Sequence, residues 1–107
     1  MQTTENTSTI NANEIIEIET YVKKGEKPPK GRKYKIRIDN EKYVVKTEEM
    51  TGRQLLDLAD KNPVDQFAIF QRLKGGQTLK IEFDDVVSFL TPGIERFMTL
   101  PLDQTEG

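Results

Sequence analysis

The sequence contains no cysteine and no histidine in its 107 residues. These two absences exclude thiol and imidazole nucleophiles, histidine general bases, zinc sites built on Cys or His, iron–sulfur clusters and disulfides. Carboxylates remain as ligands for hard cations, but such cations bind weakly unless several oxygens converge. We therefore expect no catalytic residue, no metal site and no cofactor, and we expect that the chain is not itself an enzyme.

A strong net charge and a long apolar run are also missing. The 16 basic and 18 acidic residues give a formal net charge of −2, whereas a general nucleic-acid binder is usually strongly basic. The chain does not open on a signal-peptide pattern, and no apolar run approaches the roughly 20 residues that span a bilayer. We expect a cytoplasmic protein with neither nucleic acid nor membrane as a partner.

Large apolar side chains are scarce in residues 1–33, which we expect to form a flexible N-terminal extension. Residues 1–13 are rich in Thr and Asn. Residues 25–33 contain two prolines, which disfavour both helix and strand pairing, and several basic residues that keep the segment solvated.

Within this extension, residues 14–24 predict a short helix. Asn13 can cap its start and Gly25 can end it. One face of that helix would carry Ile15, Ile18 and Val22. A short strand is the alternative, because isoleucine and glutamate alternate over residues 15–19.

Residues 34–101 carry the patterns of a compact domain. Alternating or short apolar runs predict strands at 34–39, 42–46, 67–73, 78–83 and 95–100, with a loop at 84–90. Asp39-Asn40 is expected to turn the chain, since Asn tolerates positive φ. Gly75-Gly76 is read as a second hairpin turn and not as a processing site.

One main helix is expected after the first hairpin. Thr51 and Gln54 have the spacing of a capping box, and a hydrophobic staple pairs Met50 with Leu55. Asn62-Pro63 is expected to stop the helix. Its apolar stripe consists of Leu55, Leu58 and Ala59, with Leu56 at the edge.

The order of these elements predicts an α+β domain. A single helix would lie across a mixed sheet of four or five strands, with the first and last strands side by side in the middle. This arrangement matches the ubiquitin-like β-grasp fold. Residues 102–107 would follow it as a polar C-terminal tail.

Particular blocks of the sequence resemble the bacterial multiubiquitin domain. They are YKIRID at 34–39, TGRQLLDLA at 51–59, FAIFQRLKGG at 67–76 and GIERFMTLPLDQTEG at 93–107. The resemblance covers about residues 20–107, and the C-terminal block is its most specific part. Other members carry several such domains in tandem, whereas this chain shows no internal repeat.

The resemblance implies a protein modifier. The carboxylate of Gly107 would be activated by an E1-like enzyme, passed to an E2-like enzyme and joined to lysines of target proteins. A JAB-type or other peptidase would remove it. The family also implies a bacterial anti-phage defence system. Arg96, Thr105 and Glu106 are the residues we expect an activating enzyme to recognise beside the tail. Ubiquitin ends in Gly-Gly, whereas this chain ends Glu106-Gly107.

Two further surfaces are expected to bind partners. Phe70 lies on the opposite face of its strand from Ile69, so Phe70 and Arg72 form a candidate docking patch, unless Phe70 joins the core.

Glu82, Asp84 and Asp85 are read as a solvated acidic face rather than a metal or acid–base site.

The segment at 15–19 is similar to the acid-flanked aliphatic segments that bind SUMO by adding a strand to its sheet. Ile15, Ile16 and Ile18 would then form a self-association arm, giving a homo-oligomer. The alternative is that this arm docks on its own chain. Three functions thus stay open: a covalent modifier, a non-covalent assembly module and a sulfur carrier. Sulfur carriers usually end in Gly-Gly and lack such an arm.

Overall fold

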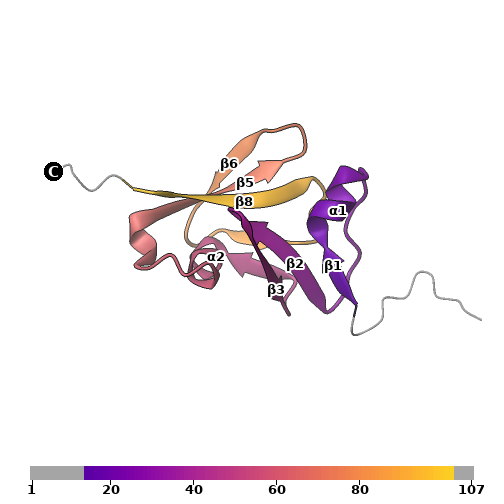
Figure 1. Cartoon of the computed structure of the whole chain (residues 1–107), viewed down its shortest axis with the longest axis horizontal. Helices are drawn as coiled ribbons and strands as arrows, with labels where there is room; N and C mark the ends of the chain where they lie inside the picture. The colour runs from indigo at the N-terminus through magenta and orange to yellow at the C-terminus, as the bar shows by residue number, and fades with distance from the viewer. Residues whose placement is uncertain (1–13, 103–107) are drawn as a thin grey trace, which may run out of the picture.

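The computed structural model describes residues 14–102, in which a mixed sheet packs against one main helix (Figure 1). Six strands pair in the order β1-β2-β8-β5-β6, with β3 also paired to β2, and within this range β4 and β7 form a second sheet. In chain order the elements are β1 (Ile15–Glu17), α1 (Ile18–Lys23), β2 (Lys33–Ile38), β3 (Glu41–Val45), β4 (Glu49–Thr51), α2 (Gly52–Leu58), the 3-10 turn η2 (Val64–Gln66), β5 (Phe67–Leu73), β6 (Thr78–Ile81), β7 (Val86–Ser88) and β8 (Ile94–Pro101).

Strands β2 and β8 lie side by side within the sheet, as the sequence predicts. Ile38 and Phe97 are parallel partners, and the Asp39 N–H donates to the Phe97 carbonyl at 2.9 Å. Strand β8 then runs antiparallel to β5 along its whole length. The predicted α+β, β-grasp arrangement is therefore confirmed.

The start of α2 follows its sequence signal. The Gln54 N–H donates to Thr51 Oγ1 at 3.1 Å, and the Thr51 N–H donates to Gln54 Oε1 at 2.9 Å, so the capping box is complete. Gly52 is required here, because a Cβ would lie 2.4 Å from the Glu82 carbonyl oxygen. The helix ends at Leu58, earlier than predicted, and Asp60 follows with φ +61°.

The core lies between α2 and one face of the sheet, which we call the inner face. Alternation places Tyr34, Ile36 and Ile38 of β2 on it. The rings of Phe89 and Phe97 meet edge to face, with centroids 6.3 Å apart. Leu56, predicted at the edge of the helical stripe, is instead completely buried.

Residues 14–33, which we call the strap, differ most from the expectation. The predicted helix over 14–24 begins only at Ile18, because the residues before it form β1. Strand β1 pairs with β2 in parallel, from Ile15↔Lys33 to Glu17↔Lys35. Ile16 and Ile18 are each 1% exposed, and Val22 is also buried.

The physical reason is that one helix cannot bury all of these side chains. A helix from residue 14 would point Ile16 away from the face shared by Ile18 and Val22. A strand followed by a helical turn directs all three inward. The strap is therefore packed onto the domain, so residues 14–33 do not form the flexible extension that we expected. Residues 1–13 lie outside the described range.

Two short strands were also not expected. The segment predicted as a loop at 84–90 contains β7, which pairs with β4 through Met50↔Val87. Each of these strands has three residues, too few for an alternating pattern to be recognised. The main sheet likewise has six strands and not four or five, because the strap adds β1.

Candidate functional site

The face of the sheet turned away from α2, which we call the outer face, is strongly basic. Strand alternation and the pairing registers place on it Lys33, Lys35, Arg37, Lys42, Arg72, Lys80 and Arg96. Glutamates of the strap neutralise part of this charge. The Glu17 carboxylate accepts from Lys42 Nζ at 2.6 Å, and the Glu19 carboxylate accepts from Arg37 Nε at 3.0 Å. Most of the acidic residues that make the net charge of the chain negative therefore lie away from the outer face.

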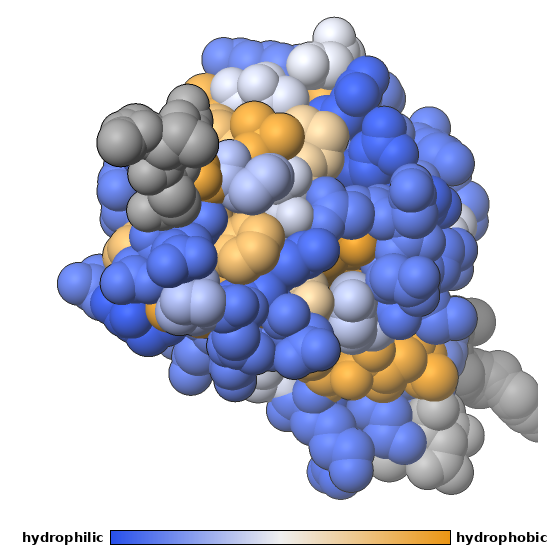
Figure 2. All heavy atoms as spheres, turned by 60° about the vertical axis from the view of Figure 1, so that its left-hand side comes forward, coloured by the Kyte–Doolittle hydropathy of each residue, from blue (hydrophilic) through white to orange (hydrophobic). Residues whose placement is uncertain are grey.

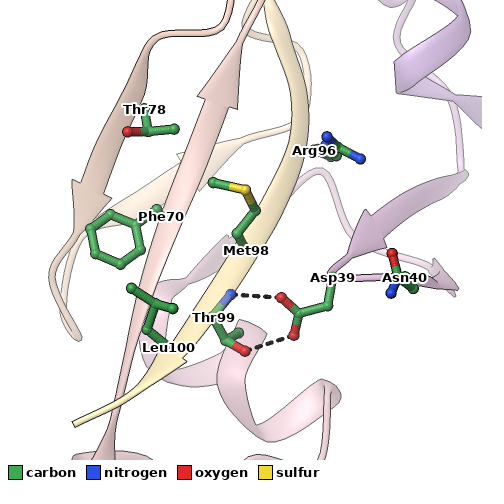
Figure 3. A pocket seen from close by; sticks show the side chains of 8 residues that line it. All are labelled: Asp39, Asn40, Phe70, Thr78, Arg96, Met98, Thr99 and Leu100. Atoms are coloured by element: carbon green, nitrogen blue, oxygen red, sulfur yellow. Dashed lines mark hydrogen bonds between the residues drawn. The ribbon is translucent and has the colours of Figure 1, made fainter. Parts of the chain in front are cut away.

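A groove of about 420 Å³ crosses the outer face (Figure 3). Phe70 and Met98 are direct partners across β5 and β8 and supply its apolar floor, together with Leu100. In Figure 3, Phe70 and Thr78 lie to one side of Met98, and Arg96 lies to the other side with Asp39 and Asn40. The groove thus joins an apolar floor to a cationic end.

Apolar side chains are buried in the middle of β8 and exposed at its end and just beyond it. Phe97 is completely buried, Leu100 is 57% exposed and Leu102 is 41% exposed. On the face drawn in Figure 2, hydrophobic residues form small separate groups in a mostly hydrophilic surface. The Leu102 N–H donates to the Gln66 carbonyl at 2.8 Å, which holds the last described residue beside η2. The groove therefore lies at the root of the C-terminal tail.

Asp39 fixes the position of β8 at this site. The Thr99 N–H and Thr99 Oγ1 donate to its carboxylate at 2.8 and 2.6 Å, and Lys61 Nζ lies 3.9 Å away. Its φ of +57° makes this contact possible, so Asp39, and not Asn40, adopts the positive φ of the hairpin turn. The negative charge of Asp39 is therefore already compensated. Sequence reasoning missed this role, because its partner lies 60 residues away.

Arg96 is the uncompensated cation of the groove. It lies directly opposite Arg72 across β8 and β5, an unfavourable position for two like charges. Arg72 Nε lies 3.4 Å from Glu95 Oε1, but without hydrogen-bond geometry, whereas Arg96 has no ion pair within residues 14–102. The Nε atoms of both arginines are buried without a hydrogen-bond partner. This pair would be stabilised by an added anionic group.

The predicted docking residues are only partly brought together. Phe70 lines the groove and so belongs to a surface, while Arg72 shares its face but does not line the groove. Arg96, predicted beside the tail, does line it. The predicted tail residues Thr105, Glu106 and Gly107 lie outside the described range.

The predicted self-association arm is not available as an arm. Ile16 and Ile18 belong to the core of their own chain, and only Ile15, 43% exposed, is accessible. In residues 14–33 the segment instead packs on its own domain, which is the alternative that the sequence left open.

The acidic segment at 82–85 organises a turn. The Glu82 N–H donates to the Asp85 carboxylate at 2.8 Å. Within residues 14–102, no three Asp or Glu side chains are grouped so that they could hold a metal ion. No helix in this range is long and apolar enough to cross a membrane.

A family model supports the fold and its assignment. The model for multiubiquitin matches residues 34–101. This chain belongs to the multiubiquitin family. Neither a curated protein nor a solved structure matches it significantly. The strap lies outside the matched residues, although Ile16 and Ile18 complete the core of this multiubiquitin domain.

Proposed function

We propose that this multiubiquitin-family protein is a covalent modifier, activated by an E1-like enzyme at the carboxylate of Gly107 and transferred through an E2-like enzyme to target lysines. The observation that supports this function most is the course of β8, which leaves the core at Phe97 and reaches the exposed Leu102. The tail therefore begins at an accessible edge of the domain, where an enzyme can engage it.

The chemistry requires little of the chain itself. ATP converts the carboxylate to an acyl-adenylate with release of pyrophosphate, and an enzyme thiolate then displaces AMP to form a thioester. After transfer to a second enzyme thiol, the lysine amine attacks the carbonyl carbon, and the thiol leaves as an amide bond forms. Glycine suits this route, because its carbonyl carries no neighbouring Cβ. The modifier is thus a substrate and not an enzyme.

The groove supplies a docking surface near the reacting tail. Arg96 and the apolar floor would orient the domain on an activating enzyme, while Thr105 and Glu106 would enter its channel. We also propose that the modifier acts in a bacterial antiviral defence system, with a peptidase that reverses conjugation. A phage plaque assay with cells expressing the chain without Gly107 tests that role, because protection should be lost.

The decisive experiment incubates the full chain with ATP and a cognate E1-like enzyme, and resolves thioesters on non-reducing gels. Deletion of Gly107 should abolish the thioester, whereas Arg53→Ala on α2, at the opposite face, should leave it intact. A thioester that forms equally without Gly107 would refute this assignment. Mass spectrometry of the tail separates a sulfur carrier, which would show exchange of one carboxylate oxygen for sulfur.

A further inference from the structure

The outer-face groove has a chemical character that specifies its ligand. Its floor of Phe70, Met98 and Leu100 suits an aliphatic side chain, and Leu100 is more than half exposed. Arg96 has no ion pair within residues 14–102, and Lys80 lies directly opposite Phe70 on the same face. A peptide with one aliphatic residue and nearby carboxylates matches both properties.

The chain itself contains such a segment. The tail begins with Leu102 and continues with Asp103 and Glu106. We propose that the groove binds the tail of a second copy of this chain, with Leu102 on the apolar floor and the two carboxylates near Arg96 and Arg72.

Length argues against a contact between Asp103 and Arg96 within one chain. Leu102 is held at Gln66, and Arg96 lies six residues back along β8, which is about 20 Å. Residues 103–107 span at most about 17 Å when fully extended, and reversing direction uses part of that length. Asp103, the first of them, therefore cannot reach Arg96 of its own chain. A neighbouring molecule has no such restriction.

The contact would be head-to-tail. The groove of one copy and the tail of the next are different surfaces, so the interface is heterologous and leads to rings or open filaments. A nucleic acid would also be attracted to a basic face. The floor favours a peptide, because Met98 and Leu100 are aliphatic and Phe70 is the one aromatic side chain among the lining residues on which a base could stack.

This contact is non-covalent and does not rest on the conjugation proposed above. A chain in which Gly107 is replaced by alanine would lose conjugation but should keep the contact, because Leu102, Asp103 and Glu106 are unchanged.

The direct test titrates a peptide of residues 100–107 into the ¹⁵N-labelled full chain. We expect a dissociation constant on the order of 1 mM, because one aliphatic side chain and two exposed ion pairs give weak binding. Amide shifts should centre on Phe70, Arg96 and Met98. Arg96→Glu should weaken binding at least about tenfold, whereas Arg53→Glu, the matched control on α2, should not change it.

The same titration can overturn the proposal. Equal binding by a peptide that carries Asp103→Asn and Glu106→Gln would refute it. Amide shifts confined to other faces of the domain, or the absence of any shift, would refute it as well. Competition by single-stranded RNA with no effect of the peptide would assign the face to nucleic acid instead.

Sedimentation of the full chain provides an independent test. The average mass should rise with concentration, and the rise should shrink when salt is increased from 0.05 to 0.5 M, because the contact uses exposed charges. A chain lacking residues 103–107 should stay monomeric. Two outcomes would exclude binding between copies through the tail. One is association that persists in the shortened chain, and the other is tail-dependent shifts that do not change on dilution.

Discussion

The two ends of the described chain carry similar side chains but differ in their structural roles. The strap combines aliphatic residues with glutamates, and the C-terminal segment combines leucines with acidic residues. Ile16 of the strap is 1% exposed, whereas Leu100 is 57% exposed. The strap and the end of β8 lie at opposite sides of the molecule (Figure 1). An aliphatic side chain from an acid-rich part of the sequence can therefore be buried, as Ile16 is, or exposed, as Leu100 is.

The difference arises from the available edge of the sheet. Strands β2 and β8 share only the pair Ile38↔Phe97, so the first half of β2 has an open edge. Residues 34–38 of β2 are paired with β3 on the other side, and β1 fills the open edge at 33–35. At the other end, β8 is already paired with β5 through Pro101, so the chain continues beyond the sheet.

The largest effect should come from truncating a buried strap residue. Ile16→Ala should lower the free energy of unfolding by about 2–5 kcal/mol, because it leaves a cavity in the core. The matched changes Ile15→Ala and Leu100→Ala, at exposed positions, should each cost about 0.5 kcal/mol or less. Urea denaturation of the full chain measures all three. Equal costs at Ile15 and Ile16 would contradict the placement of the strap.

A smaller effect is expected at Asp39, which holds β8 at the root of the tail. Asp39→Ala removes two hydrogen-bond acceptors and should cost about 1–3 kcal/mol, to which the positive φ adds strain. Asp39→Asn should cost less, because Asn tolerates that φ and keeps one acceptor. Thermal unfolding followed by circular dichroism gives the order, with Asn40→Ala as the control. Equal losses for the alanine and asparagine variants at Asp39 would contradict the contribution assigned to the positive φ and to the acceptor that asparagine keeps.

The smallest effect is the pH dependence from Glu17. The hydrogen bond from Lys42 is the main cause that lowers the pKa of Glu17 below its usual 4.5, and burial opposes it. A lowered folded-state pKa stabilises the fold above the unfolded-state pKa, and this stabilisation disappears as the pH falls through the folded-state value. At pH 7, Glu17→Gln should cost less than about 1 kcal/mol. The two proteins should converge in stability in acid, and a difference that is constant with pH would exclude this linkage.

The sequence predicted elements whose signals are local. The capping box of Thr51 and Gln54 formed as expected, and the predicted strand at 67–73 has the bounds of β5. Strand β1 could not be predicted with certainty, because a three-residue strand depends on the open edge of β2. The pairing of β4 with β7 was missed because each of these strands has only three residues, too few for an alternating pattern to be recognised.

The groove was predicted only through single residues. Phe70 was recognised because it alternates with Ile69 on an expected strand, and Arg96 because it lies just before the tail. Their arrangement with Asp39 depends on registers between strands that are distant in sequence. Arg72 was predicted with Phe70, but the cation that lines the groove comes from β8. The spacing of residues within one strand does not show which of the two paired arginines, Arg72 of β5 or Arg96 of β8, lines the groove.

The connection between α1 and β2 has a consequence for proteolysis. The side chain of Lys30 is 78% exposed, and the bond after it lies between the strap helix and β2. A protease that cuts there would break the chain without removing any strand pair, because β1 would stay paired with β2 through Ile15 to Glu17. The cut molecule would then be a complex of two complementing fragments, whose survival on dilution depends on their affinity and no longer on one continuous backbone.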